Sequence, residues 1–71
     1  MNIDFSEINN ALNSGWFWRL EGFMGKFVVY QCRVVRQDAG VITKYAAVNE
    51  SPQLAINEAA DFIKKHNENN S

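Results

Sequence analysis

The segment from residue 16 to residue 48 constrains the fold most, because three strand-like runs follow one another with only short loops between them. The runs Trp16–Glu21, Lys26–Arg36 and Val41–Val48 are rich in aromatic and β-branched residues. The glycine-containing stretches 22–25 and 37–40 are typical of hairpin turns. Parallel neighbours would need a crossover of about a dozen residues or more. The sequence therefore predicts a three-stranded antiparallel sheet.

A helix is expected before the sheet. Asp4 stands at an N-cap position, with Glu7 three residues later as in a capping box. Apolar residues then recur at helical spacing, and Ser14-Gly15 provides a stop at which glycine can adopt the left-handed conformation. These signals predict a helix over residues 5–13.

A second helix is expected after the sheet. Ser51 caps it and Pro52 takes its first position, where a missing N–H costs nothing. The residues that follow carry a broad apolar face, whereas residues 67–71 contain no apolar side chain. The sequence therefore predicts one α+β domain over residues 1–66, followed by a disordered polar tail over 67–71.

The element order is thus α-β-β-β-α, and the simplest packing places both helices on one face of the sheet. If Trp16, Trp18 and Leu20 point toward the helices, the other face stays open. Aromatic, aliphatic and arginine side chains on such a face are typical of protein interfaces. The reverse assignment would expose Trp16 and Trp18 instead. The predicted partner-binding residues are Phe17, Arg19, Glu21, Phe27, Val29, Gln31, Arg33 and Val35.

Composition argues against several other functions. Cys32, the one cysteine, lies within a strand-like run, and His66, the one histidine, lies near a helix end. We therefore expect no catalytic residues, no metal-binding residues and no cofactor. A net charge of −1 argues against a general nucleic-acid binder. No signal peptide or membrane span is expected, which favours a cytoplasmic location. A nucleic-acid-binding alternative would use Arg19, Lys26, Arg33, Arg36 and Lys44.

Residues 26–63 resemble small phage proteins of the NinX and phage ABA-sandwich type. The resemblance is carried by Tyr45-Ala46-Ala47-Val48, Glu50-Ser51-Pro52-Gln53-Leu54-Ala55-Ile56 and Ala59-Ala60. It implies a phage or mobile-element accessory protein without enzymatic activity. Anti-CRISPR and other anti-defence inhibitors share this size and build, so the expected partner is a host protein or protein complex, and the expected location is the host cytoplasm. A homodimer is also left open.

Two other resemblances give the alternative function. The element order is similar to that of double-stranded-RNA-binding domains, although Ser51-Pro52-Gln53-Leu54 replaces the lysine cluster with which that family holds phosphates. The β-β-β-α half is similar to HicB-type antitoxins, but their proline-glycine-cysteine segment is missing here. These resemblances imply a module that binds nucleic acid or a toxin.

Overall fold

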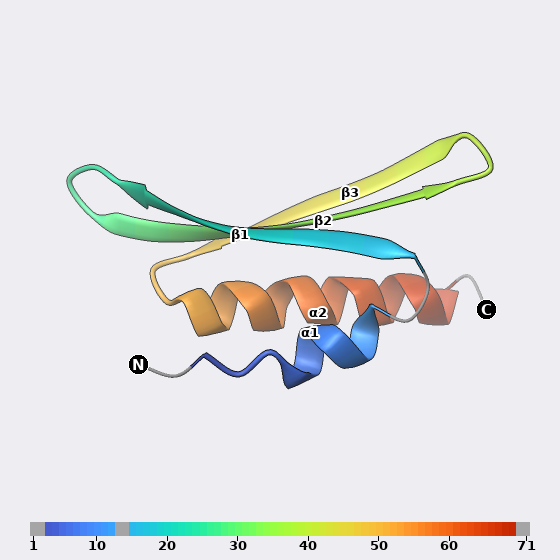
Figure 1. Cartoon of the computed structure of the whole chain (residues 1–71), viewed down its shortest axis with the longest axis horizontal. Helices are drawn as coiled ribbons and strands as arrows, with labels where there is room; N and C mark the ends of the chain where they lie inside the picture. Colours follow the sequence, from blue (N-terminus) through green and yellow to red (C-terminus); the bar gives the residue numbers. More distant parts are fainter. Residues whose placement is uncertain (1–2, 13–14, 70–71) are drawn as a thin grey trace.

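The computed structural model describes residues 3–12 and 15–69 of the chain. Within these ranges the chain forms helix α1 (Ser6–Ala11), strands β1 (Trp16–Met24), β2 (Val28–Asp38) and β3 (Val41–Asn49), and helix α2 (Pro52–Asn69). Figure 1 shows the strands as one open sheet and the helices together beneath it. The predicted α+β class and α-β-β-β-α order are confirmed.

The sheet is antiparallel throughout, with β2 in the centre. Strand β1 is longer than predicted and includes Gly22, which the sequence placed in a loop. Gly22 pairs with Tyr30, whose ring carbon Cε1 lies 3.4 Å from the point that a Cβ on Gly22 would occupy. The tyrosine ring thus covers a strand glycine, and the loop shifts to residues 25–27.

The second hairpin closes over two residues. Ala39 and Gly40 have φ of +50° and +82°. Positive φ at both central positions is the type I′ pattern, whose twist matches that of the flanking strands. The hairpin turn predicted over residues 37–40 is therefore confirmed, and within it Ala39 adopts a conformation that alanine normally avoids.

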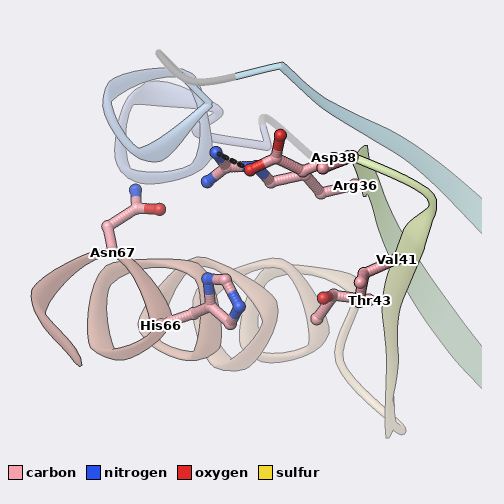
Figure 2. A pocket seen from close by; sticks show the side chains of 7 residues that line it. Arg36, Asp38, Val41, Thr43, His66 and Asn67 are labelled. Atoms are coloured by element: carbon pink, nitrogen blue, oxygen red, sulfur yellow. Dashed lines mark hydrogen bonds and ion pairs between the residues drawn. The ribbon is translucent and has the colours of Figure 1, made fainter. Parts of the chain in front are cut away.

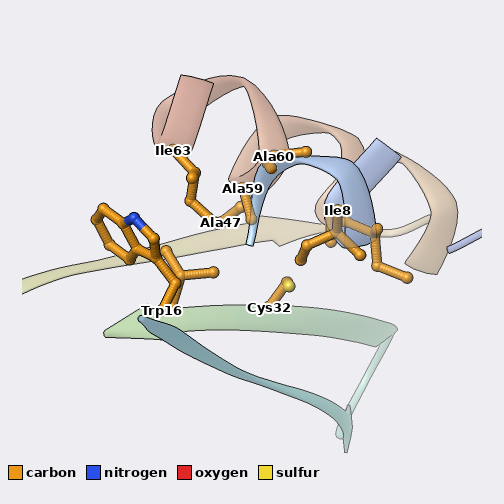
Figure 3. Packing of buried hydrophobic residues seen from close by; sticks show 11 residues of the cluster. Ile8, Trp16, Cys32, Ala47, Ala59, Ala60 and Ile63 are labelled. Carbon is orange, nitrogen blue, oxygen red and sulfur yellow. The ribbon is translucent and has the colours of Figure 1, made fainter. Parts of the chain in front are cut away.

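The core lies between the sheet and the helices (Figure 3). Trp16 of β1 is 5% exposed and packs into this core. The buried alanines of α2, Ala55, Ala59 and Ala60, let the helix lie close to the strands. Since Trp16, Cys32 and Val34 are buried, the face that they occupy points toward the core, which decides between the two face assignments that the sequence left open. The buried apolar residues of the described chain are Ile8, Ala11, Trp16, Cys32, Val34, Ala47, Ala55, Ile56, Ala59, Ala60 and Ile63.

Helix α1 begins one residue later than predicted and without the capping box. Phe5 is its N-cap, and the Asp4 carboxylate accepts a hydrogen bond from the Ser6 N–H at 2.9 Å. Glu7 forms an ion pair with Lys64 of α2 instead of reaching back to the cap. Gly15 has the expected positive φ, at +80°. The predicted helix residue 13 and the stop residue 14 lie outside the described ranges.

Helix α2 is longer than predicted, since residues 67–69 form its last turn rather than a disordered tail. Asn67 explains part of the difference. Its Oδ1 accepts a hydrogen bond from Trp16 Nε1 at 3.4 Å, and its Nδ2 donates to the Ala11 carbonyl oxygen at 3.5 Å. A polar residue thereby bridges β1 and α1. The remaining predicted tail residues, 70 and 71, lie outside the described ranges.

Candidate protein-binding surface

The side of the sheet opposite the helices forms a continuous surface, which we call the open sheet face. The strand register places its side chains in rows across the three strands: Phe17, Val35 and Lys44 form one row, and Arg19, Arg33 and Ala46 form the next. The open sheet face consists of Phe17, Arg19, Glu21 and Phe23 of β1, Val29, Gln31, Arg33 and Val35 of β2, and Ile42, Lys44, Ala46 and Val48 of β3.

Seven of the eight predicted partner-binding residues lie on the open sheet face. Phe17 is the most prominent, with 74% of its surface exposed, and Arg33 is also exposed. Phe27 differs from the prediction, because it lies in the loop before β2, although it too is exposed. The other predicted positions are exposed or half-buried.

The sequence prediction missed the contribution of β3 and the end of β1. Ile42, Lys44, Ala46 and Val48 alternate along Val41–Val48 in the pattern that predicted the faces of the other strands. That alternation would have found them. Phe23 was missed because it was assigned to a loop.

Two arginines face each other near the centre of the open sheet face. Arg19 is the register partner of Arg33, and like charges directly opposite across antiparallel strands are destabilising. Arg19 Nη2 lies 2.5 Å from Glu21 Oε1, so one of the two cations has an anionic neighbour on its own strand. Both side chains of this pair are partly exposed, and such pairs contribute about 0–1 kcal/mol.

The open sheet face is positively charged, although the protein as a whole is slightly negative. Arg19, Arg33 and Lys44 oppose the single carboxylate of Glu21, a net charge of +2 on a chain whose net charge is −1. Acidic residues instead gather on the helical layer. The described residues therefore form a dipolar molecule, with a basic sheet and an acidic helical side.

Exposed apolar side chains also concentrate on the sheet. Among the described residues, Phe5 and Leu54 are the large exposed apolar side chains of the helical layer, whereas nine others belong to the sheet and its first hairpin loop. Four of those nine lie on the helical side of the sheet: Met24, Val28 and Val41 beside the hairpin turns, and Tyr45, which stacks on Phe62. Figure 1 shows the hairpin ends reaching away from the helices. The nine are Phe17, Phe23, Met24, Phe27, Val28, Val41, Ile42, Tyr45 and Val48.

A shallow depression of about 360 Å³ lies over β2 and β3, mostly on the open sheet face. Its outward-pointing lining residues mix polar, cationic and apolar groups: Gln31, Arg33, Val35, Lys44 and Ala46. An arginine beside aliphatic side chains can receive a carboxylate while the rest of the partner's side chain is desolvated.

A second hollow, of about 580 Å³, lies between the β2–β3 hairpin and the end of α2 (Figure 2). Arg36 and Asp38 line it and form an ion pair at 3.2 Å, while His66 and Asn67 line it from the helix. The His66 ring stands edge-on to Trp16, with centroids 5.2 Å apart. Arg36 and Asp38 pair with each other, and His66 and Asn67 contact Trp16, so the hollow is a weaker candidate than the open sheet face.

Cys32 and His66, the residues considered for nucleophilic chemistry, have different environments. Cys32 is fully buried in the core, and burial raises the pKa of its thiol to about 11. A thiol in this state is a poor nucleophile near neutral pH. His66 instead lies in an aromatic cluster with Trp16 and Phe62.

Neither a metal centre nor a membrane span is found in the part of the chain that the structure describes. Over residues 3–12 and 15–69, no three His, Cys, Asp or Glu side chains are grouped so that they could hold an ion. No described helix combines the length and apolar character needed to cross a bilayer.

No protein-family model, curated protein or solved structure matches this chain.

Proposed function

We propose that this protein is a non-enzymatic binding protein whose open sheet face docks onto an apolar and acidic surface of another protein. The observation that carries the proposal is the pairing of Arg19 with Arg33 beside the exposed ring of Phe17. Aromatic and arginine side chains are the residues most enriched among those that dominate binding energy at protein interfaces.

The charge of the face indicates the chemistry of the partner. Two arginines held opposite each other repel, and a carboxylate from a partner would relieve that repulsion while forming charge-assisted hydrogen bonds with both. Phe17 and Val35, in the adjacent row, would contact apolar groups around that carboxylate. The proposed partner surface is therefore an acidic residue surrounded by aliphatic or aromatic side chains.

A second copy of the chain fits the open sheet face less well than a different protein does. Stacking two copies face to face about a central two-fold axis would bring the Arg19–Arg33 pairs together. Like charges brought together in a desolvated interface cost several kcal/mol, of the order of what a moderate interface supplies in total. The net positive charge of the open sheet face thus favours a different protein over a second copy as the partner.

The environment of the candidate nucleophile supports a binding role. Cys32 is enclosed by the core, and its raised pKa keeps it protonated. The resemblance of residues 26–63 to small phage accessory proteins gives the partner class that we propose, a host protein complex whose activity is inhibited by binding in the host cytoplasm.

The proposal is tested by comparing variants of the face with a matched variant of the helical layer. Phe17→Asp and Arg33→Glu alter the open sheet face, whereas Leu54→Asp introduces the same charge at an exposed apolar position of α2. Proteins captured from bacterial lysate by the wild type are identified, purified and titrated against each variant. We expect Phe17→Asp and Arg33→Glu to weaken binding at least tenfold, and Leu54→Asp to leave it unchanged.

Two results would overturn the proposal. In the first, a purified partner binds all three variants with the affinity of the wild type, which would place its site elsewhere. In the second, the captured material is lost on nuclease treatment and a nucleic acid binds directly with steep salt dependence. That second result would assign Arg19, Arg33 and Lys44 to phosphate contacts instead.

A further inference from the structure

The outer edge of β3 offers a second contact, made by backbone groups of residues whose side chains belong to the open sheet face. Among residues 3–12 and 15–69, strand β3 ends the sheet and has β2 as its one strand neighbour. It pairs with β2 over nine consecutive positions without a bulge, contains no proline, and carries one charged residue, Lys44. Prolines, bulges and charges are the devices that normally protect an edge strand from pairing with another chain.

The hairpin turn fixes which backbone groups of β3 point outward. In a two-residue hairpin the flanking residues form a hydrogen-bonded pair, here Asp38 and Val41. Every second residue of β3 from Val41 onward therefore bonds to β2. The residues between them direct their N–H and C=O groups to the free edge: Ile42, Lys44, Ala46 and Val48.

These four residues form a self-complementary row about Tyr45. A two-fold axis perpendicular to the sheet, beside Tyr45 and midway between the two β3 strands, pairs Ile42 with Val48 of the second copy, and Lys44 with Ala46. Ile42 and Val48 are 59% and 55% exposed in the single chain, so this register covers both. Shifting the axis to position 44 would instead set Lys44 against Lys44 of the other copy. We propose that two copies pair antiparallel through β3, about Tyr45, into one six-stranded sheet.

The helical layer is compatible with this arrangement. Helix α2 packs against both β2 and β3, so its axis lies roughly above the line between them. With strands about 4.8 Å apart, the α2 helices of two copies would lie about 10 Å apart, which is the separation of packed helices.

The charges of α2 are also complementary about the same axis. The ring of Tyr45 stacks on Phe62 with centroids 4.4 Å apart, so an axis beside Tyr45 also passes near Phe62. Glu58 lies four residues before Phe62 and is on the β3 side, where it accepts a hydrogen bond from Asn49. Lys65 lies three residues after Phe62. Glu58 and Lys65 are both exposed. The axis therefore brings Lys65 of one copy opposite Glu58 of the other.

Strand β1 is the weaker candidate for pairing. Gly22 interrupts it, and interior glycines weaken strand pairing. The segment before α1 also lies against β1, since the ring of Phe5 packs on Trp18 with centroids 5.5 Å apart. The proposed dimer keeps the open sheet faces of both copies on one side, so it is compatible with the proposed function and does not depend on it.

A charge-pair experiment tests both the edge and the register. One variant carries Ile42→Glu with Val48→Glu, and another carries Ile42→Lys with Val48→Lys. Both positions are exposed, so each variant should fold, which circular dichroism checks. We expect sedimentation to give a dimer for the wild type and monomers for each variant. We expect native mass spectrometry of the two variants mixed in equal amounts to show the mixed dimer.

A backbone variant provides an independent test. Ala46→Pro removes an outward N–H that the dimer uses and leaves the bonds to β2 in place, whereas Ala46→Val keeps that N–H. We expect Ala46→Pro to be monomeric and Ala46→Val to remain dimeric. A wild type that stays monomeric at millimolar concentration would overturn the proposal. Dimers that persist in Ala46→Pro would place the contact elsewhere, and variants that fail to form a mixed dimer would refute the register.

Discussion

The side-chain amide of Gln53 binds both backbone polar groups of Asp4. The Asp4 N–H donates to Gln53 Oε1 at 2.7 Å, and Gln53 Nε2 donates to the Asp4 carbonyl oxygen at 2.8 Å. A residue in the first turn of α2 thus fixes the chain immediately before α1. The Glu7–Lys64 ion pair joins the two helices farther along, so α1 is positioned by polar contacts as well as by Ile8 and Ala11.

Replacing Gln53 should therefore loosen the N-terminal segment. We expect Gln53→Ala to lower the free energy of unfolding by about 1–2 kcal/mol, because it removes the two hydrogen bonds to Asp4, worth about 0.5–1.5 kcal/mol each, and a third to Asn57 Oδ1 on the surface of α2. Gln53→Glu should have an intermediate effect, since its carboxylate can accept from the Asp4 N–H but cannot donate to the carbonyl. Urea unfolding followed by tryptophan fluorescence measures both. Gln37→Ala, at an exposed position of β2, is the control. An equal loss of stability in Gln37→Ala would contradict the stabilising role of the Gln53–Asp4 hydrogen bonds.

Ala39 offers a stabilising substitution. Its φ of +50° costs an alanine roughly 1–2 kcal/mol, whereas asparagine adopts that conformation readily and Asn-Gly is the preferred type I′ pair. We expect Ala39→Asn to raise the free energy of unfolding by about 1 kcal/mol. Ala39→Val should lower it, because a β-branched residue is disfavoured at positive φ. Thermal unfolding of the three proteins checks the order, and a less stable Ala39→Asn variant would refute the turn geometry.

Burial of Cys32 should make stability depend on alkaline pH. Burial raises the pKa of this thiol from 9.0 to about 11, so the unfolded chain loses the proton before the folded protein does. The stabilisation from the raised pKa is therefore complete below pH 9 and is lost as the pH rises through about 11. Cys32→Ala should be less stable near neutral pH but should lose less stability over this range. All other ionisable groups are the same in both proteins, so the difference between their unfolding curves isolates the thiol. Identical dependence of stability on pH in the two proteins would contradict the burial of Cys32.

The last turn of α2 should contribute to stability through one side chain. We expect Asn67→Ala to lower the free energy of unfolding by about 0.5–1 kcal/mol, because its bonds to Trp16 and Ala11 are long. Asn69→Ala, two residues later and exposed, should have little effect. Chemical unfolding of the two variants makes the comparison. If Asn67→Ala and Asn69→Ala were equally stable, the result would favour the disordered tail that the sequence predicted.

The strands and their faces could be predicted because the evidence for them is local. Alternation in Trp16–Glu21 put Trp16 and Phe17 on opposite faces of the strand, and the burial of Trp16 and the exposure of Phe17 decide which of the two faces points inward. Turn residues limited the connections to hairpins. These features depend on the period of side chains along a strand and on backbone preferences, both of which a single segment carries.

The errors fall where a distant residue decides the local structure. Glu7 has the spacing of a capping box, but Lys64 of α2 attracts its carboxylate. Gly22 is a turn residue by type, but the ring of Tyr30 covers it within β1. Asn67 is polar and near the end of the chain, but its contacts with Trp16 and Ala11 hold it in α2. The pairing of Arg19 with Arg33 likewise required the strand register, which composition does not specify.

Site-specific photocrosslinking tests the role of the open sheet face most directly. A benzophenone amino acid replaces Phe17 in one protein and Leu54 in another, two exposed apolar positions on the sheet and on α2 respectively. Each protein is irradiated with the purified partner, and the crosslinked peptides are mapped. We predict crosslinks from position 17 to a partner segment rich in acidic and apolar residues, and none from position 54. Crosslinks from position 54 with none from position 17 would contradict the account.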